Sequence, residues 1–264
     1  IQGSESLLRV LFFFFLLLFF LGLGLAFPFR HSSLLKKKSR WLVNLALVFG
    51  NGLLVFLIAP LSLAQIAIIA ENNYWGLFNL WQNPDYVTVP INLLLLDMLI
   101  YWQHRLTHRI PLLWRLHRVH HTDLEVDTTT AGRFHPLEIF LSFFLKATAI
   151  VGLGIQPGTI ILFEIILNFS ALFNHSNFSF PKKLEEGLRF FVVTPDMHRI
   201  HHSTKPVETD SNYAFCLSFW DRLFLSYTPT SQENPRSMKI GLNEFRDSKK
   251  LGYWQLLLNP FLKK

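Results

Sequence analysis

Long apolar runs without charge are the feature that most constrains how this chain of 264 residues can fold. The run 10–29 contains no charged residue, and neither does the run 41–69. About 20 helical residues cross the hydrocarbon core of a bilayer, so runs of this length are typical of membrane spans. A single run could also be a buried core helix. Because several occur in one short chain, they favour an all-α, multi-pass integral membrane bundle.

Five apolar segments are expected to enter the membrane, at about 7–29, 41–69, 89–102, 137–153 and 159–173. Glycines and Pro157 punctuate the connection between the last two segments, which predicts a tight turn and a membrane hairpin. The first run is longer than the apolar core of a signal peptide, which has ~7–15 residues. We therefore expect an anchor helix at that position.

Loop charge predicts how the chain is oriented, because Lys and Arg are concentrated in short loops on the cytoplasmic side of a membrane. The loop 30–40 contains five of them, whereas 70–87 and 152–158 contain none. We therefore expect 103–135 and 174–264 on the cytoplasmic face as a histidine-rich helical cap, with the bacterial inner membrane as the favoured location. The formal net charge of +7 then fits an anionic membrane surface, and no nucleic-acid partner is expected.

Eight of the eleven histidines fall in three tight groups: His104 and His108; His117, His120 and His121; and His198, His201 and His202. Residues at i, i+3 and i+4 share one face of a helix, so each group can direct its imidazoles the same way. Neutral imidazole is the commonest metal ligand in proteins. Because these imidazoles outnumber the four ligands of one tetrahedral ion, the sequence predicts two metal ions.

Two isolated histidines, His135 and His175, lie where an apolar segment meets the predicted cytoplasmic face. Each is a weaker candidate ligand, because a lone histidine is more often a satisfied core or surface residue. Carboxylates inside a membrane are costly and usually functional, and ligating histidines commonly donate their second N–H to one. Asp97 lies seven residues before His104, so we expect it to bond His104 or His108. Less constrained candidates for the same role are Asp123, Asp127 and Asp196.

The chain resembles the fatty acid hydroxylase/sterol desaturase superfamily, and most closely its bacterial-type members, over about 97–227. The resemblance rests on the order and spacing of six motifs: HRLTH, HRVHH, RFHPLE, FNHSNF, TPDMHRIHHS and NYAFCLSFWDRLF. Members are all-helical, di-metal membrane enzymes that use O2 and an electron donor to hydroxylate or desaturate lipids and sterols. The resemblance implies that the ligands are His104, His108, His117, His120, His121, His175, His198, His201 and His202. His135 matches the histidine of the family's His-Pro element, as a ligand or a pocket residue.

The resemblance also implies cofactors and partners. The cofactors would be two iron ions, although zinc is also bound well by such ligands. The substrate would be a lipid or sterol taken from the bilayer. A separate electron-donor protein is implied, because the sequence contains no dinucleotide-binding, haem-attachment or iron–sulfur motif. On this basis 1–100 are expected to be transmembrane anchor helices, 101–227 the catalytic region with the membrane hairpin 137–173, and 228–264 a C-terminal cytosolic tail.

Two further expectations concern single positions. Some superfamily members carry a second histidine shortly after the one that matches His175, but here Asn177 follows, and we expect it to hold a water molecule near one metal. Lys146 and Glu164 are each nine residues from position 155 at the centre of the predicted turn. Antiparallel helices would place them at equal depth, so we expect an ion pair between them.

Two other classes of function remain open from the residues alone. A zinc-dependent membrane lipid hydrolase would use the same imidazoles, with Glu138 or Asp196 as the base that activates water. A metal transporter or store would place its ligands along a path through the membrane, whereas these histidines lie at segment ends. The arginines among the histidines fit contact with lipid phosphates better than nucleic-acid binding.

Overall fold

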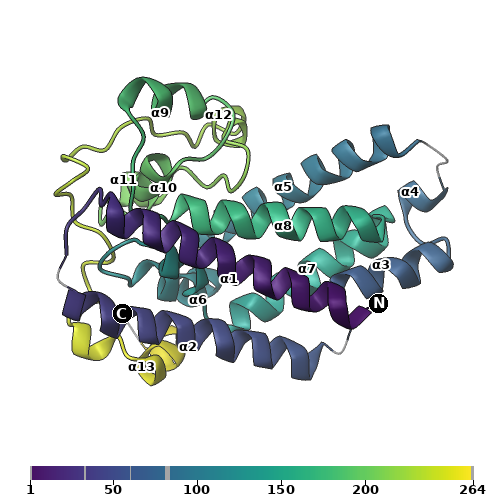
Figure 1. Cartoon of the computed structure of the whole chain (residues 1–264), viewed down its shortest axis with the longest axis horizontal. Helices are drawn as coiled ribbons and strands as arrows, with labels where there is room; N and C mark the ends of the chain where they lie inside the picture. Colours follow the sequence, from purple (N-terminus) through teal and green to yellow (C-terminus); the bar gives the residue numbers. More distant parts are fainter. Residues whose placement is uncertain (1, 33, 60, 81–83, 263–264) are drawn as a thin grey trace.

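The computed structural model describes residues 2–32, 34–59, 61–80 and 84–262, and in these residues the protein is helical. Two isolated bridges, between Val192 and Leu217 and between Ser203 and Ile240, are the extended pairings in the described chain. Five long helices form the bundle in Figure 1: α1 (Gln2–Ala26), α2 (Leu34–Ile58), α5 (Asp85–Arg109), α7 (Pro136–Leu153) and α8 (Pro157–Asn174). The predicted all-α membrane bundle is confirmed.

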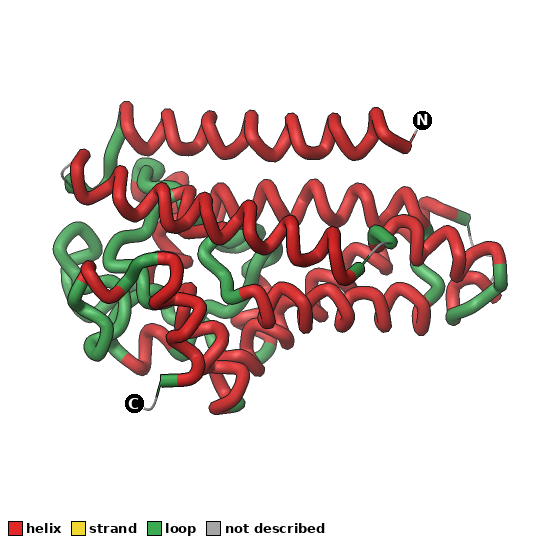
Figure 2. Tube along the Cα trace, turned by 90° about the horizontal axis from the view of Figure 1, so that it is seen from below, coloured by secondary structure: helices red, strands yellow, loops and turns green. Residues whose placement is uncertain are grey.

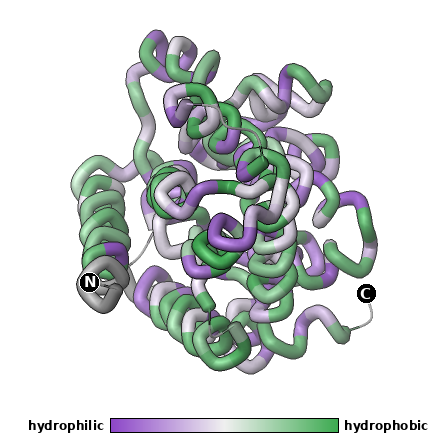
Figure 3. The backbone as a smooth tube through the Cα atoms, turned by 90° about the vertical axis from the view of Figure 1, so that its right-hand side faces the viewer, coloured by the Kyte–Doolittle hydropathy of each residue, from purple (hydrophilic) through white to green (hydrophobic). Residues whose placement is uncertain are grey.

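Five candidate spans, long and apolar enough to cross a membrane, occur in the described part of the chain, and the second of them contains more than one helix. They are Leu8–Ala26, Lys37–Leu80, Asp85–Arg109, Pro136–Leu153 and Pro157–Asn174. Much of their apolar surface points outward; Phe15 and Phe19 on α1 and Phe56 on α2, for example, are exposed. Figure 3 shows α1, beside the N label, coloured as hydrophobic over most of its length. Such a surface is suited to lipid rather than to water.

A short helix that the sequence did not predict separates α7 from α8. This helix, α3 (Leu63–Asn72), contributes Leu63 and Ala67 to a core that also contains Ile150 of α7 and Phe163 of α8. Small residues at such a contact allow helix backbones to approach closely. The predicted hairpin therefore has its turn, but α3 packs between its two arms.

The turn itself depends on two glycines. Gly154 ends α7 in the left-handed conformation, with φ of +72°, and lies against Gly76, which follows α3 and precedes the short α4 (Leu77–Leu80). A Cβ atom on Gly76 would lie 2.1 Å from the backbone nitrogen of Gly154. Only residues without side chains permit this approach.

The predicted ion pair between Lys146 and Glu164 is wrong. Glu164 instead accepts a hydrogen bond from Arg9 of α1 at 2.9 Å. The reason lies in the packing, because α8 lies against α1 (Figure 1), whereas α3 intervenes between α8 and α7. Equal depth along two helices does not bring their side chains together when a third helix separates them.

The remaining elements form a cap at one end of the bundle, where most of the loops in Figure 2 gather. The cap contains α6 (Pro111–His121), η1 (Thr128–Gly132), α9 (Lys182–Leu188), α10 (Pro195–His201), α11 (Pro206–Thr209), α12 (Phe219–Leu223), η2 (Ser248–Lys250), α13 (Tyr253–Leu258) and η3 (Asn259–Phe261). The segment expected to be a tail packs onto this cap. Leu251 and Leu256 are buried beside Leu47 and Val119, and Arg118 donates a hydrogen bond to Asn259.

Candidate metal centre

Nine histidines converge inside the cap in two groups whose nitrogen atoms lie within 4.8 Å of one another. The five-histidine group consists of His104, His108, His117, His121 and His201. The four-histidine group consists of His120, His175, His198 and His202. All nine residues were candidates from the sequence, and the fold brings them together from α5, α6, α8 and α10.

A sharp junction between α5 and α6 places the histidines of α5 against those of α6. Ile110 is both the last cap of α5 and the first cap of α6, and Pro111 opens α6. Proline suits the first turn of a helix, where its missing N–H would have no partner. The chain therefore reverses within one residue, and His104 and His108 at the end of α5 face His117 and His121 of α6.

Each HxxHH motif is divided between the two groups. His117 and His121, four residues apart, belong to the five-histidine group, whereas His120 belongs to the other. In the second motif, His198 and His202 belong to the four-histidine group, whereas His201 belongs to the five-histidine group. Helical spacing explains this division, since residues at i and i+4 lie one above the other. The two groups are thus held side by side by the same short helices.

The four-histidine group has the dimensions of a metal site. The Nε2 atom of His175 lies 3.1 Å from that of His120 and 3.0 Å from that of His198, which in turn lies 3.2 Å from Nε2 of His202. A tetrahedral ion with bonds of ~2.0–2.1 Å to nitrogen needs its ligands roughly 3.3 Å apart. The four nitrogens therefore converge at a spacing that suits one ion.

Buried ring nitrogens in the five-histidine group also lack partners. In the described part of the chain, Nε2 of His108, His117, His121 and His201 makes no hydrogen bond. An unpaired buried polar nitrogen is unfavourable by about 1–3 kcal/mol. Several such nitrogens around one point are the ligand set that a metal ion would satisfy. The residues present therefore fit two ions, one in each group.

Hydrogen bonds at the opposite ring nitrogen orient many of these imidazoles. Nδ1 of His104 donates to the carbonyl oxygen of Tyr213, and Nδ1 of His201 donates to that of Ser211, both at 2.7 Å. Nδ1 of His175 donates to the carbonyl oxygen of Ala171 at 2.7 Å. A ring that donates through Nδ1 presents the lone pair of Nε2 to a metal.

Burial favours the neutral form of several of these rings. Burial is the largest cause that lowers the pKa of His175 to about 4 and that of His201 to about 3, and neighbouring imidazoles contribute to both values. The same two causes, burial first, lower the pKa values of His120, His121, His198 and His202. Neutral imidazole is the form that binds metals, so the cap supplies its ligands without the need to remove protons.

The carboxylate that contacts the ring of His117 is Glu138, and Asp97 lies against other groups. Nδ1 of His117 donates to Glu138 at 2.6 Å, and both groups are buried. Asp97 instead accepts hydrogen bonds from the backbone nitrogens of Cys216 and Leu217 and from the indole of Trp220. It thereby anchors the segment that carries Tyr213. The expectation of a direct bond from Asp97 to His104 or His108 is corrected, because the cap folds back over α5 at this depth.

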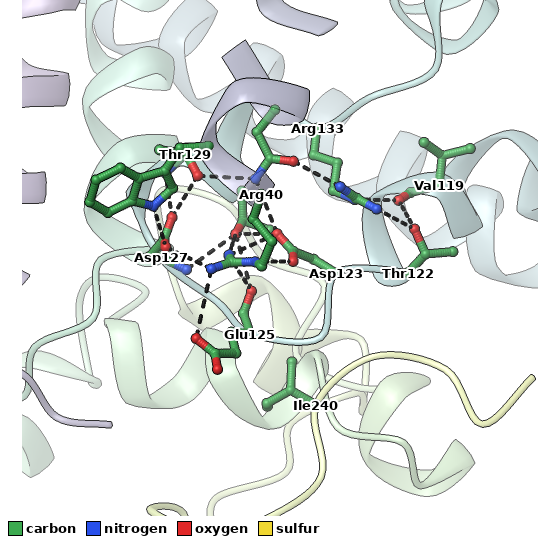
Figure 4. Close-up of polar contacts among 12 residues, drawn as sticks. Arg40, Val119, Thr122, Asp123, Glu125, Asp127, Thr129, Arg133 and Ile240 are labelled. Atoms are coloured by element: carbon green, nitrogen blue, oxygen red, sulfur yellow. Dashed lines mark hydrogen bonds and ion pairs between the residues drawn. The ribbon is translucent and has the colours of Figure 1, made fainter. Parts of the chain in front are cut away.

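Asp123 and Asp127 belong to a polar network that ties α2 to the chain after α6 (Figure 4). Arg40 pairs with Asp123 at 2.5 Å and with Asp127 at 3.0 Å. Arg133 donates to the carbonyl oxygen of Val119 at 3.0 Å and so caps the end of α6. Burial opposes ionisation of Asp123, but Arg40 and Arg133 hold its pKa well below the usual range. Neither aspartate hydrogen-bonds a clustered imidazole; both hold the helix that carries three of the rings.

Three other expected site residues are engaged elsewhere. Asp196 accepts from Arg199 and from Ser179, not from a histidine. Asn177 pairs with both backbone groups of Arg30, at 3.1 and 2.8 Å, so its amide is not free to hold a water at the cluster. His135 lies outside both groups. Its Nδ1 caps α7 by accepting from the Leu137 nitrogen, and its Nε2 contacts the Leu257 carbonyl.

A cavity of about 290 Å³ connects both groups to the membrane bundle. His104 and His117 of one group and His120 and His198 of the other line its inner end. Its walls are mainly apolar, with Ile100, Phe134, Ile139, Leu167, Leu172 and Phe215 among the lining residues. Such a cavity suits an aliphatic chain with one end at the imidazoles.

Comparison with known proteins assigns this arrangement. The model of the fatty acid hydroxylase family matches residues 89–226, just over half of the chain. The chain belongs to the fatty acid hydroxylase family. All nine clustered histidines fall within the matched residues, as does Glu138. The resemblance inferred from the motifs is confirmed.

Curated relatives of this family member are lipid-modifying enzymes by name. Alkylglycerol monooxygenase of Danio rerio is 30% identical over 162 residues, which are 58% of this chain and 35% of the relative. Ornithine lipid hydroxylase OlsE of Rhizobium tropici is 27% identical over 223 residues, 84% of this chain and 62% of the relative. Sphingolipid C4-hydroxylase sur2 of Schizosaccharomyces pombe is 24% identical over 147 residues, 55% of this chain and 49% of the relative.

The chain thus spans between about a third and two thirds of the length of these relatives. No solved structure matches it significantly.

Sequence reasoning missed two carboxylates of this hydroxylase-family site. The sequence suggested Glu138 only as a base for hydrolysis. Its place at the start of an apolar segment, three residues after His135, could have indicated a charge that needs a partner, because an unpaired charge is costly there. Asp210 contacts Nδ1 of His108 at 3.3 Å. No local pattern marks Asp210, because it reaches α5 from a loop more than a hundred residues away.

Proposed function

We propose that this chain is a membrane-bound di-iron oxygenase that hydroxylates a lipid, using O2 and electrons from a separate donor protein. The observation that carries the proposal is the opening of both imidazole groups into one mainly apolar cavity. Oxidation of an unactivated C–H bond requires a redox metal, because no side chain performs this chemistry alone, and two metals held beside an aliphatic chain would supply it. Relatives named as hydroxylases and monooxygenases of lipids support the same reaction class.

The nine histidines would hold the metals and set their environment. The five-histidine group would hold one ion and the four-histidine group the other, and the ions would supply the redox chemistry. Glu138 would fix the orientation of His117 through their hydrogen bond. The carbonyl oxygens of Tyr213, Ser211 and Ala171 would do the same for His104, His201 and His175.

The cavity would bind the lipid chain and exclude water. Ile100, Phe134 and Leu172 would contact methylene groups and hold a C–H bond beside the two imidazole groups. Gln103 and Ser142 in the same wall hydrogen-bond one another at 3.1 Å, so they would satisfy each other beside the lipid chain. A dry site protects reactive chemistry from side reactions with water.

A zinc hydrolase is favoured less by these contacts. It would need a carboxylate free to activate water beside a metal. Glu138 is bonded to His117, and Asp196 is bonded to Arg199 and Ser179. A transporter is also favoured less, because the histidines gather in one cap and not along a path through the bundle.

The location of the reaction is part of the proposal. Five Lys and Arg residues lie in the segment 30–40, where α2 begins next to the cap, and they favour the cytoplasmic face of a bacterial inner membrane. An electron donor would then approach the cap from the cytoplasm, while the lipid would enter from the bundle.

The test is metal analysis combined with a turnover assay. Purified protein, loaded anaerobically with ferrous iron, is expected to retain two irons per chain and to add one atom from isotopically labelled O2 to a membrane lipid when a chemical or protein reductant is supplied. The paired variants His120→Ala and His121→Ala, which remove one ring from each group, should each lower the iron content by about one. Retention of one metal or none, or product formation without O2, would overturn the proposal.

A further inference from the structure

The ammonium of Lys146, on α7 in the membrane bundle, is not paired with any described residue. Within the residues that the structure describes, Lys146 makes neither a hydrogen bond nor an ion pair within 4.0 Å. Glu164 interacts electrostatically with Lys146, but that carboxylate is already paired with Arg9 at 2.9 Å. Lys146 is half-buried within the bundle. A charge inside a membrane is costly unless it is paired, so an unpaired lysine at this position is suited to a partner that the protein does not supply.

The position of Lys146 on α7 makes it hard for the amine to reach a membrane surface. Lys146 is seven residues from Leu153 at one end of α7 and ten from Pro136 at the other. These separations correspond to roughly 10 and 15 Å along a helix. The lysine stem extends less far than either, so snorkelling to a headgroup region does not account for this residue.

Lys146 instead lines the cavity that leads to the imidazoles, and Asn168 lines it from α8. Asn168 also has an accessible side chain, and no hydrogen bond of that side chain occurs in the described residues. A second cavity, of about 540 Å³, shares Phe13, Val48 and Asn168 with the first and reaches Arg9 and Glu164. Lys146 and Asn168 thus line the same cavity, which the second cavity adjoins at Phe13, Val48 and Asn168.

Both polar groups lie at a similar distance from the clustered histidines. Lys146 is eight residues beyond Glu138, which bonds His117, and eight residues of helix span about 12 Å. Asn168 is seven residues before His175 on α8, or about 10 Å. The part of the cavity between these levels is lined by apolar side chains such as Ile139 and Leu172.

We propose that Lys146, assisted by Asn168, binds an anionic oxygen group of the lipid substrate and so fixes which carbon is oxidised. The group is a carboxylate or a phosphate, since both accept charge-assisted hydrogen bonds from an ammonium. The aliphatic chain then runs about 12 Å from this group to the imidazoles, through the apolar part of the cavity. This inference rests on the proposed lipid oxidation, but it concerns binding, which can be measured without turnover.

The first experiment measures binding to purified, metal-loaded protein without reductant, so that no reaction occurs. Radiolabelled palmitic acid, its methyl ester and a lysophosphatidic acid are compared on the wild type, Lys146→Met, Lys146→Arg and the exposed control Lys183→Met. Loss of a hydrogen bond to a charged group should weaken binding of the preferred anionic lipid about 10- to 100-fold in Lys146→Met. Lys146→Arg should retain most of the affinity, and the methyl ester should bind all four proteins alike.

The two anionic probes identify the source of the charge. Lysine-dependent binding of palmitic acid would assign the group to a carboxylate, and lysine-dependent binding of the lysophosphatidic acid alone would assign it to a phosphate. If Lys146→Met binds both anions as tightly as the wild type, while its thermal unfolding and metal content are unchanged, the inference is overturned. Equal binding of the methyl ester and the anions by the wild type would overturn it as well.

A second experiment separates this inference from the proposed function. Lipids of different chain length are oxidised by the wild type and the products are mapped by mass spectrometry. Oxidation at a fixed distance from the polar group supports the role of Lys146, whereas oxidation at a fixed distance from the methyl end contradicts it while leaving the hydroxylase proposal intact. Lysine-dependent binding without any oxidation would support the role of Lys146 and contradict the hydroxylase proposal.

Discussion

Removal of the Glu138 carboxylate tests whether it orients a metal ligand. Glu138 accepts a 2.6 Å hydrogen bond from Nδ1 of His117, and both residues are buried. Loss of such an outer partner typically weakens metal binding 10- to 100-fold. That range corresponds to about 1.4–2.8 kcal/mol of binding free energy. We expect Glu138→Ala to fall in this range, because Nδ1 would lose its acceptor in a site that excludes water.

The isosteric variant Glu138→Gln separates charge from geometry. Its amide oxygen can still accept the bond from His117, but a neutral acceptor stabilises less than a carboxylate, by about 1 kcal/mol. The expected loss of metal affinity is therefore about fivefold. Glu186→Gln, on the exposed face of α9, is the matched control and should bind metal as the wild type does.

Metal affinity would be measured by competition with a chromogenic chelator for ferrous and zinc ions. Thermal unfolding of the metal-free proteins would show whether each variant is folded. If Glu138→Ala binds both ions with wild-type affinity while it is folded, Glu138 does not orient a ligand. The assignment of His117 to a metal would then lose its main support from hydrogen bonding.

Three further predictions concern stability. Asp97→Ala would leave the donors on Cys216, Leu217 and Trp220 without an acceptor, at about 1–3 kcal/mol each, so its melting temperature should fall far more than that of the exposed control Asp85→Ala. Gly76→Ala would place a Cβ 2.1 Å from the Gly154 nitrogen and should unfold at a much lower temperature than Gly52→Ala, where nothing lies within 4 Å; equal melting would refute this contact. Burial raises the pKa of Asp221 to about 6. The folded protein therefore favours the protonated form of this group, and its contribution to stability is complete below the unfolded pKa near 3.8 and is lost as pH rises through about 6. The wild type should therefore lose up to about 3 kcal/mol relative to Asp221→Asn between pH 4 and 7, and parallel pH profiles of the two proteins would contradict this.

The membrane character and the candidate ligands could be predicted because both are local properties of the sequence. An uncharged run of about 20 residues must satisfy its backbone internally in a bilayer, which leaves a helix as its fold. The spacing of His117, His120 and His121 follows the helical period in the same way, so these rings share a face in any α-helix.

The partners of the polar groups could not be predicted, because they depend on which helices meet. Asp97 was expected to bond His104 from the same helix, but a segment more than a hundred residues away covers it. Lys146 and Glu164 were expected to pair, but α3 occupies the space between α7 and α8. Spacing along one helix predicts the direction in which a side chain points, but it does not predict which segment packs on that side.

The order of residues alone thus determined the number and type of the apolar helices, the three histidine groups and the family of this protein. Only the tertiary structure decided how the two HxxHH motifs are divided between two metal-sized groups, which carboxylate contacts His117, and which cation is left unpaired in the cavity. The physical reason is that helical period is set by neighbouring peptide units, whereas burial and hydrogen bonding are settled between segments that only the complete packing brings together.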